Sequence, residues 1–282
     1  MEFHKSALYV VGTPIGNLDD LSKRAIETLS TVDFIAAEDT RVTIKLLNRF
    51  GIKKPMISYF EHNKQDHGEV IIERLLAGEN CALVSDAGMP AISDPGETLV
   101  ARCAEENIPV YAVPGPTAFV SALAISGLPT GRFTFEGFLS MNKKNRNAHL
   151  QSLEKETRTM VFYEAPHKLY RTLVDMYNVF GERKIVLVRE LTKIHEEVIR
   201  TTFPEAIKQY RQKDPKGELV LIIEGAKEEP PEENEISLED AVEQAKILVG
   251  EGFSASEAAK QAAKNSPYKK SDIYRKLTSE QD

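Results

Sequence analysis

Residues 84–96 constrain the possible folds of this chain more than any other segment. They contain two Gly, two Pro and two Asp, a composition that favours neither strand nor helix. The short apolar run 81–84 before them predicts a buried strand, and residues 97–106 predict a helix. The segment is longer than the two to six residues usual between a strand and a helix. Open α/β sheets bind ligands where such segments follow a strand. The segment therefore predicts a ligand-binding loop, with a plain turn as the alternative.

Three other segments repeat the pattern of a strand, a turn and a helix. The predicted strands are residues 7–11, 33–37 and 109–113, and each is followed by small or charged residues. Together with 84–96, these loops are predicted to lie at one edge of a parallel sheet. The loop 12–17 only partly matches a dinucleotide-binding fingerprint, because Pro14 stands where the second Gly is required.

The rest of the chain predicts a second domain and a helical tail. A hinge at 127–132 separates an N-terminal α/β domain, residues 1–127, from a second α/β domain of mixed strand order, residues 128–226. Residues 227–236 are acidic and Pro-rich, which is typical of a linker. Residues 237–282 predict three helices, the first with a capping box. Three short helices with a basic last one suggest a helix-turn-helix-like domain, and a packing or dimerisation bundle is the alternative.

The charge distribution leaves a nucleic-acid partner open. The chain has a net charge of −7, and residues 227–243 account for all of it. Two segments are basic: residues 140–172, with a net charge of +4, and residues 260–276, with +5. Such patches suit nucleic acid, although many are simply solvated surface.

Cysteine use and hydropathy favour a cytoplasmic protein. Cys81 and Cys103 lack the spacing of a metal or redox motif, so we expect reduced thiols and no metal site. No apolar run is long enough to cross a membrane, and the first residues do not look like a signal peptide.

Five motifs together resemble the tetrapyrrole methylase superfamily, and within it the branch that modifies ribosomal RNA. They are residues 12–18 (GTPIGNL), 38–41 (EDTR), 85–96 (SDAGMPAISDPG), 113–117 (VPGPT) and 162–168 (FYEAPHK). The resemblance implies two α/β domains with S-adenosylmethionine (AdoMet) in the cleft between them, and a homodimer. It further implies 2′-O-methylation of a cytidine ribose in 16S ribosomal RNA, with the small (30S) subunit as partner.

The resemblance also transfers cofactor contacts to positions of this chain. They are Ile15, Asp86, Ala87, Gly88, Ala91, Ile92, Thr117, Ala118, Glu164 and Leu191. Porphyrinoid methylases carry a Gly-Asp-Pro-type core in the central loop and often Met at the position of Glu164. Both departures favour the RNA branch.

Charged residues near the predicted cleft are candidates for chemistry and RNA binding. Glu38 and Asp39 follow a strand, so either could take the proton of a ribose hydroxyl, or both could simply begin a helix. Arg41, Arg132 and Lys168 are candidates for holding RNA phosphates. Two other functions stay open: methylation of a small tetrapyrrole, and AdoMet-sensing nucleic-acid binding without catalysis.

Overall fold

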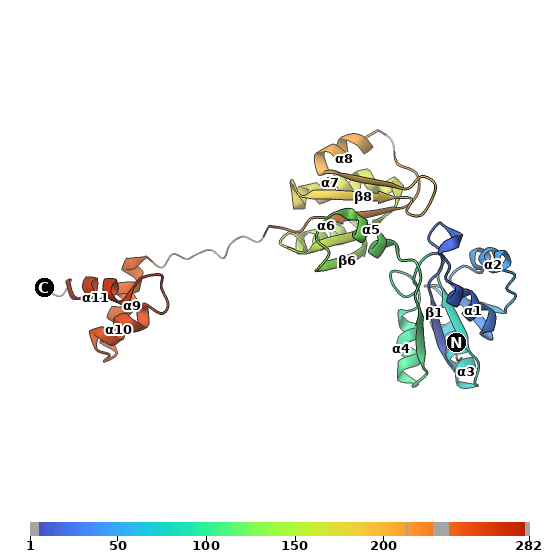
Figure 1. The fold of residues 1–282 in the computed structure, drawn as a ribbon, viewed down its shortest axis with the longest axis horizontal. Helices are drawn as coiled ribbons and strands as arrows, with labels where there is room; N and C mark the ends of the chain where they lie inside the picture. The colour runs from blue at the N-terminus through green and yellow to red at the C-terminus, as the bar shows by residue number, and fades with distance from the viewer. Residues whose placement is uncertain (1–5, 213, 228–236, 280–282) are drawn as a thin grey trace. The chain divides into compact units, whose positions relative to one another are not determined.

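The computed structural model describes residues 6–212, 214–227 and 237–279 and divides into two compact units, Met1–Ala226 and Lys227–Asp282 (Figure 1). The first unit holds two five-stranded sheets, and the second is helical. Apart from Lys227, the predicted acidic linker lies outside the described residues.

The first sheet is parallel, with strand order β3-β2-β4-β1-β5. Its strands are β1 (Leu8–Val11), β2 (Phe34–Ala37), β3 (Met56–Ser58), β4 (Cys81–Val84) and β5 (Val110–Val113). Every residue of β1, β2 and β4 is buried. Continuous apolar runs of this kind are typical of parallel strands that are covered on both faces. The shared edge predicted for the four loops is thereby confirmed.

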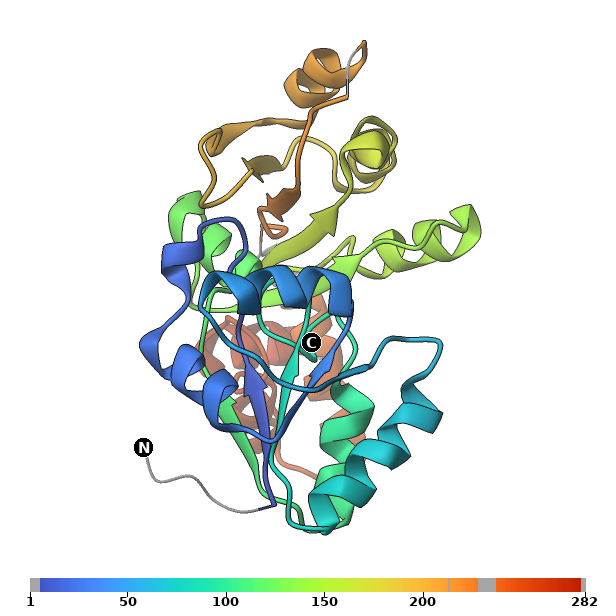
Figure 2. The same cartoon turned by 90° about the vertical axis from the view of Figure 1, so that its right-hand side faces the viewer.

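Helices cover both faces of the first sheet (Figure 2). One face packs against α1 (Lys23–Thr31) and α2 (Thr40–Arg49), which follow the short 3-10 helix η1 (Leu18–Asp20). The other face packs against α3 (Lys64–Leu76) and α4 (Glu97–Glu105). We call this sheet with η1 and α1–α4 the first lobe.

The second sheet is mixed, as the sequence predicted, and its strand order is β6-β7-β10-β8-β9. Only the β6–β7 pair is parallel. The strands are β6 (Phe133–Phe138), β7 (Thr159–Glu164), β8 (Lys184–Arg189), β9 (Glu197–Thr202) and β10 (Leu219–Ile223). One face packs against α6 (Lys143–Ser152), α7 (Leu169–Phe180) and α8 (Phe203–Tyr210), and η2 (Pro166–Lys168) precedes α7.

Helix α5 (Ala118–Ser126) covers the opposite face of the second sheet. Its Ala122 and Leu123 pack among valines of β7, β8 and β10. By packing, the helix therefore lies with the second sheet, although it precedes the hinge predicted at 127–132. We call the second sheet with η2 and α5–α8 the second lobe. The loop before α5 joins the two lobes.

Arg146 of α6 belongs to the basic segment 140–172, yet its side chain is buried. Its side chain is 5% exposed and its Nη2 lies 2.8 Å from Oδ2 of Asp175 on α7. Its Nη1 donates to the carbonyls of Ser140 and Met141, each at 3.2 Å. The buried ion pair anchors α6 and the segment after β6, so Arg146 does not contribute to a basic surface patch.

The second unit is a three-helix bundle of α9 (Leu238–Gly250), α10 (Ala255–Ala262) and α11 (Lys270–Ser279). The predicted capping box at Ser237 and Asp240 is present, and Ser254 and Glu257 form another before α10. Alanines form most of the buried core, together with Val242, Ile273 and Leu277. Exposed cations among the described residues of this unit include Lys246, Lys260, Lys264, Lys269, Lys270 and Arg275. Within the described ranges, no helix is long and apolar enough to cross a membrane.

Candidate functional site

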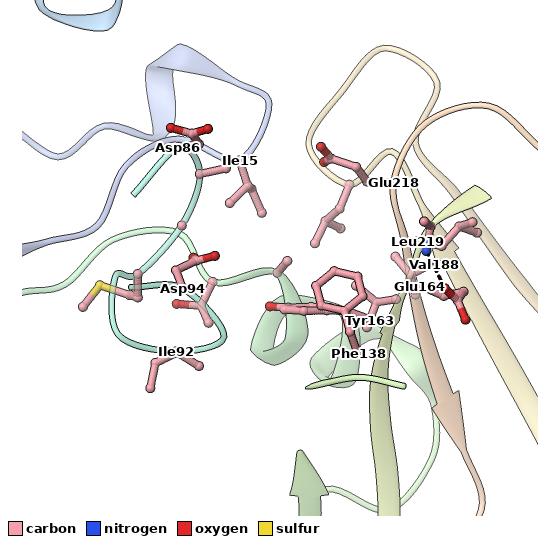
Figure 3. Close-up of a pocket in the computed structure, with 18 of the residues that line it drawn as sticks. Ile15, Asp86, Ile92, Asp94, Phe138, Tyr163, Glu164, Val188, Glu218 and Leu219 are labelled. Carbon is pink, nitrogen blue, oxygen red and sulfur yellow. Dashed lines mark hydrogen bonds between the residues drawn. The ribbon is translucent and has the colours of Figure 1, made fainter. Parts of the chain in front are cut away.

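A cavity of about 350 Å³ lies between the two lobes (Figure 3). The first lobe contributes the loops after β1, β2, β4 and β5, and the second lobe contributes the ends of β6, β7 and β8 and the start of β10. The lining residues include Ile15, Glu38, Asp86, Ala87, Gly88, Met89, Ile92, Asp94, Thr117, Ala118, Phe138, Tyr163, Glu164, Val188, Leu191, Glu218, Leu219 and Val220. Pockets of this volume are of the size that binds small ligands.

The loops of the first lobe are held together by backbone contacts. Thr13 and Gly88 exchange two backbone hydrogen bonds of 2.9 and 3.1 Å, and Gly88 has φ +87°. A Cβ atom on Gly12 would lie 2.7 Å from Cα of Gly115 and 2.7 Å from Sδ of Met89. Gly12 is thus required for close packing of two loops. This is a different role from the phosphate cradle that the loop partly resembles.

Strained backbone lies on both sides of the cavity. Ala91 and Ser93 in the central loop have φ of 66° and 65°, and Glu190 and Thr192 after β8 have φ of 53° and 66°. The Thr192 hydroxyl accepts a 3.1 Å hydrogen bond from the backbone of Asn17, which joins the two lobes. Each such conformation costs of order 1–3 kcal/mol and is typical of functional sites.

Three carboxylates of the first lobe line the cavity: Glu38, Asp86 and Asp94. The backbone of Asp86 donates to Oε2 of Glu38 at 3.3 Å, and the backbone of Asp39 donates to Oδ1 of Asp86 at 3.1 Å. Burial raises the pKa of Glu38 and of Asp86. The loops after β2 and β4 therefore hold two carboxylates close together in a partly dry site.

Asp94 has the most perturbed carboxyl of the three. Burial, with a smaller contribution from the charge of Glu38, raises the pKa of Asp94 to about 6, and the Ser85 hydroxyl opposes this. Tyr163 faces it from the second lobe (Figure 3). Burial raises the pKa of Tyr163, and the negative charge of Asp94 adds to the effect. Carboxylates shifted in this way in a cleft are candidates for function.

The structure brings nine of the ten predicted cofactor positions to the cavity. They are Ile15, Asp86, Ala87, Gly88, Ile92, Thr117, Ala118, Glu164 and Leu191. Ala91 is not among the lining residues and packs against Gly96 instead. The carboxylate of Glu164 accepts from Thr172 and from the backbone of Ala165, so it is directed away from the cavity.

The other predicted residues separate into one that lines the cavity and four that do not. Glu38 lines it. Asp39 begins α2 and pairs with Arg41, whose Nη2 lies 2.7 Å from Oδ2. The Arg41 guanidinium lowers the pKa of Asp39 to about 2, which argues against a base. Arg132 is exposed and Lys168 is half-buried at the end of η2, and neither lines the cavity.

Sequence reasoning missed several lining residues. They are Met89, Asp94, Phe138, Tyr163, Ala165, Pro166, Val188, Glu218, Leu219 and Val220. Asp94 lies in the predicted ligand loop, so its presence there was a usable signal. The residues of β8 and β10 carry no local signal, because their place at the cavity depends on the packing of the lobes.

The lining fits a small organic cation with an apolar part. Among the described residues that line the cavity, the charged ones are all acidic, and Lys193 lies 3.3 Å from one of them, Glu218. Ile15, Leu191 and Val188 offer an apolar surface. Gly88 has φ +87°, a backbone conformation that residues with a side chain rarely adopt, so this turn of the loop favours glycine.

The fold and the cavity define a class of two-lobed α/β proteins with a cavity of small-ligand size between the lobes. The model of the family Tetrapyrrole (Corrin/Porphyrin) Methylases matches residues 7–207, and the chain belongs to this family. It is 48% identical to Ribosomal RNA small subunit methyltransferase I of Synechocystis sp., over 95% of each chain. A protein of the same name from Halalkalibacterium halodurans is 48% identical, over 96% of this chain and 94% of its own.

A third relative of that name is shorter than this chain. The Thermotoga maritima protein is 49% identical, over 98% of its own length and 77% of this chain.

Solved structures show the same fold at low identity. The crystal structure of uroporphyrin-III-C-methyltransferase from Thermus thermophilus matches with a TM-score of 0.55 and 18% identity, over 77% of this chain and 94% of that one. Cobalt precorrin-4 methyltransferase, a cobalamin biosynthetic enzyme, matches with a TM-score of 0.57 and 17% identity, over 77% and 94%.

Proposed function

We propose that this protein transfers a methyl group from AdoMet to the ribose 2′-hydroxyl of a cytidine in small-subunit (16S) ribosomal RNA. One observation carries the proposal: relatives named as small-subunit ribosomal RNA methyltransferases are 48% identical over 95% or more of this chain. The family membership and the acidic cavity support a methyl donor that carries positive charge.

One part of the cavity lining would hold and orient the cofactor. Asp86 and Asp94 offer negative charge to its cationic groups, while Ile15 and Leu191 offer apolar contact to its adenine. When bound, AdoMet supplies an activated methyl group on a positively charged sulfur. The protein then has to align the ribose oxygen with that methyl group, and alignment is a large part of such catalysis.

Glu38 is the better placed of the two predicted bases. It lines the cavity, and burial raises its pKa, which suits a group that accepts a proton near neutral pH. The Asp39 side chain is 25% exposed, does not line the cavity and is tied to Arg41. We therefore expect Glu38→Gln to lower turnover strongly with little change in AdoMet affinity, and Asp39→Asn to stay near normal. Equal turnover of the Glu38→Gln and Asp39→Asn variants would show that Glu38 is not the base.

RNA contact is proposed for cations outside the cavity. The Arg41 side chain is 88% exposed, Arg132 is exposed, and Lys168 is half-buried beside the cavity residue Pro166. Such side chains fix the register of the RNA backbone without reading its sequence. We also propose that the exposed cations of the second unit bind RNA.

Methylation of a small tetrapyrrole is the alternative that the solved neighbours suggest. Uroporphyrinoids carry many carboxylates, and the cavity offers Glu38, Asp86 and Asp94 without a basic lining residue among those described. Like charges at close range in a partly buried site are unfavourable. This electrostatic mismatch favours RNA, whose phosphates can stay outside the cavity while a neutral ribose enters.

Transfer of labelled methyl from AdoMet to 30S subunits that lack this modification tests the function. Nuclease mapping of the product should place the label in a ribose-methylated cytidine. Label on a porphyrinoid and none on RNA would support the tetrapyrrole alternative. Cofactor binding without transfer to either substrate would support a non-enzymatic AdoMet sensor.

We also propose a homodimer in the cytoplasm. The family resemblance supports the dimer. The compartment is supported by Cys81 and Cys103, which are both buried free thiols.

A further inference from the structure

Phe138 is an aromatic side chain that lines the cavity and yet remains 58% exposed. It ends β6, next to Tyr163 of β7, with which it is paired in register. Their ring centroids lie 5.4 Å apart at an interplanar angle of 52°. The ring therefore has a protein partner on one side and is open to solvent elsewhere.

A β-bulge directs Phe138 toward the cavity. In a regular strand, residues 135 and 138 would face opposite sides. The pairing of β6 with β7 shifts between Phe135 and Gly137, and Gly137 has φ +62°. As a result both Phe135 and Phe138 contact Tyr163. Bulges next to active sites commonly re-aim one side chain in this way.

The surroundings hold this ring in place. Tyr163 packs edge-on against Phe135 at 5.1 Å, and Phe135 stacks on Phe119 of α5 at 4.3 Å. Just beyond Phe138, the buried Arg146 holds the carbonyls of Ser140 and Met141. A ring that its neighbours already hold in place suits a binding platform, because little side-chain freedom is lost when a ligand binds.

The carboxylates lie across the cavity from this platform. Asp94 and Asp86 come from the first lobe, and Phe138 and Tyr163 from the second (Figure 3). A nucleoside has the matching form, with a flat base at one end and ribose hydroxyls at the other. Enzymes that act on single nucleotides unstack the target and stack its base on aromatic side chains.

We propose that Phe138 is the stacking platform for the base of the target nucleotide, which places the ribose toward Glu38 and Asp94. This inference rests on the proposed RNA substrate. Phe138 is a positioning residue here, because it contacts the base and not the reacting oxygen.

The test compares Phe138→Ala, Phe138→Leu and Phe138→Trp with a matched control, Phe133→Ala. Phe133 lies on the same strand and is 38% exposed, but it does not line the cavity. We expect Phe138→Ala and Phe138→Leu to lose about ten- to hundredfold in kcat/KM on 30S subunits. The tryptophan variant should retain activity, and AdoMet affinity, measured by calorimetry, should stay within twofold in all four.

A photocrosslink gives a readout independent of activity. Ribosomal RNA that carries 5-iodocytidine, assembled into 30S subunits and irradiated with the protein, should crosslink at Phe138 or Tyr163. Near-normal kcat/KM in Phe138→Leu would overturn the platform, and so would a parallel loss of AdoMet affinity. If the unaltered protein transfers no methyl to RNA, the proposed function fails. In that case the crosslink alone tests whether a base binds at Phe138, and the absence of a crosslink would overturn this inference.

Discussion

Replacing Asp94 with asparagine should stabilise the free protein at pH 8. Moving a carboxyl pKa from 3.8 to about 6 corresponds to about 3 kcal/mol, at 1.36 kcal/mol per pH unit. Solvent screening of this half-buried side chain reduces the expected gain to about 1–2 kcal/mol. Asparagine keeps the shape and can still accept from Ser85, but it carries no charge that burial penalises.

The pH dependence follows from the direction of this shift. A raised carboxyl pKa means that the folded state binds the proton more tightly than the unfolded state. Stability from this group is therefore present at low pH and is lost as the pH rises from about 4 to about 6. The advantage of Asp94→Asn should accordingly be full above about pH 7 and shrink toward pH 4.

Urea denaturation followed by circular dichroism measures this difference, since the chain contains no Trp for fluorescence. Asp39→Asn is a control that should lower the stability instead of raising it. Arg41 lowers the pKa of Asp39, so the charge of Asp39 is favourable at neutral pH. Saturating AdoMet should stabilise Asp94→Asn less than the unaltered protein, by about 1.4 kcal/mol for a tenfold weaker affinity. An Asp94→Asn protein less stable than the original at pH 8 would refute the reasoning, and unchanged AdoMet affinity would remove Asp94 as the partner of its positive charge.

Two further predictions concern a loop contact and the second unit. Gly12→Ala should weaken AdoMet binding and cost about 1–3 kcal/mol of stability, because its Cβ would lie 2.7 Å from Gly115. Calorimetry measures the AdoMet affinity and urea unfolding measures the stability. Gly131→Ala is the control, because Gly131 has open space around it. Equal effects of Gly12→Ala and Gly131→Ala would contradict the importance of the contact between Gly12 and Gly115. Deleting residues 237–282 should leave kcat nearly unchanged, raise KM for 30S subunits and flatten the dependence of binding on salt. Unchanged binding and an unchanged salt slope would return this unit to a packing role.

The sequence predicts what depends on local order. The buried strand at 81–84, the loop after it and the placement of Gly88 follow from apolar runs and turn residues. The same holds for the capping box at Ser237, since capping involves residues only three positions apart. These features led directly to the edge of the first sheet where the cavity lies.

The remaining features depend on residues far apart in the chain. The raised pKa of Asp94 depends on burial and on Glu38, more than 50 residues earlier. Arg146 is buried because Asp175 on the next helix pairs with it. Phe138 reaches the cavity because of a β-bulge, and Gly137 is the one local residue that could have indicated this bulge. Sequence patterns relate residues that are close in the chain, so they do not reveal contacts of this kind.

The acidic lining of the cavity has a consequence for turnover. If AdoMet is the donor, as proposed, methyl transfer converts its sulfonium into a neutral thioether. The by-product keeps its charged amino group but offers one positive charge fewer to Asp86 and Asp94. The reaction itself therefore weakens the attraction that helps to load the site. We expect such a cavity to hold the by-product less tightly than the methyl donor and so to limit product inhibition.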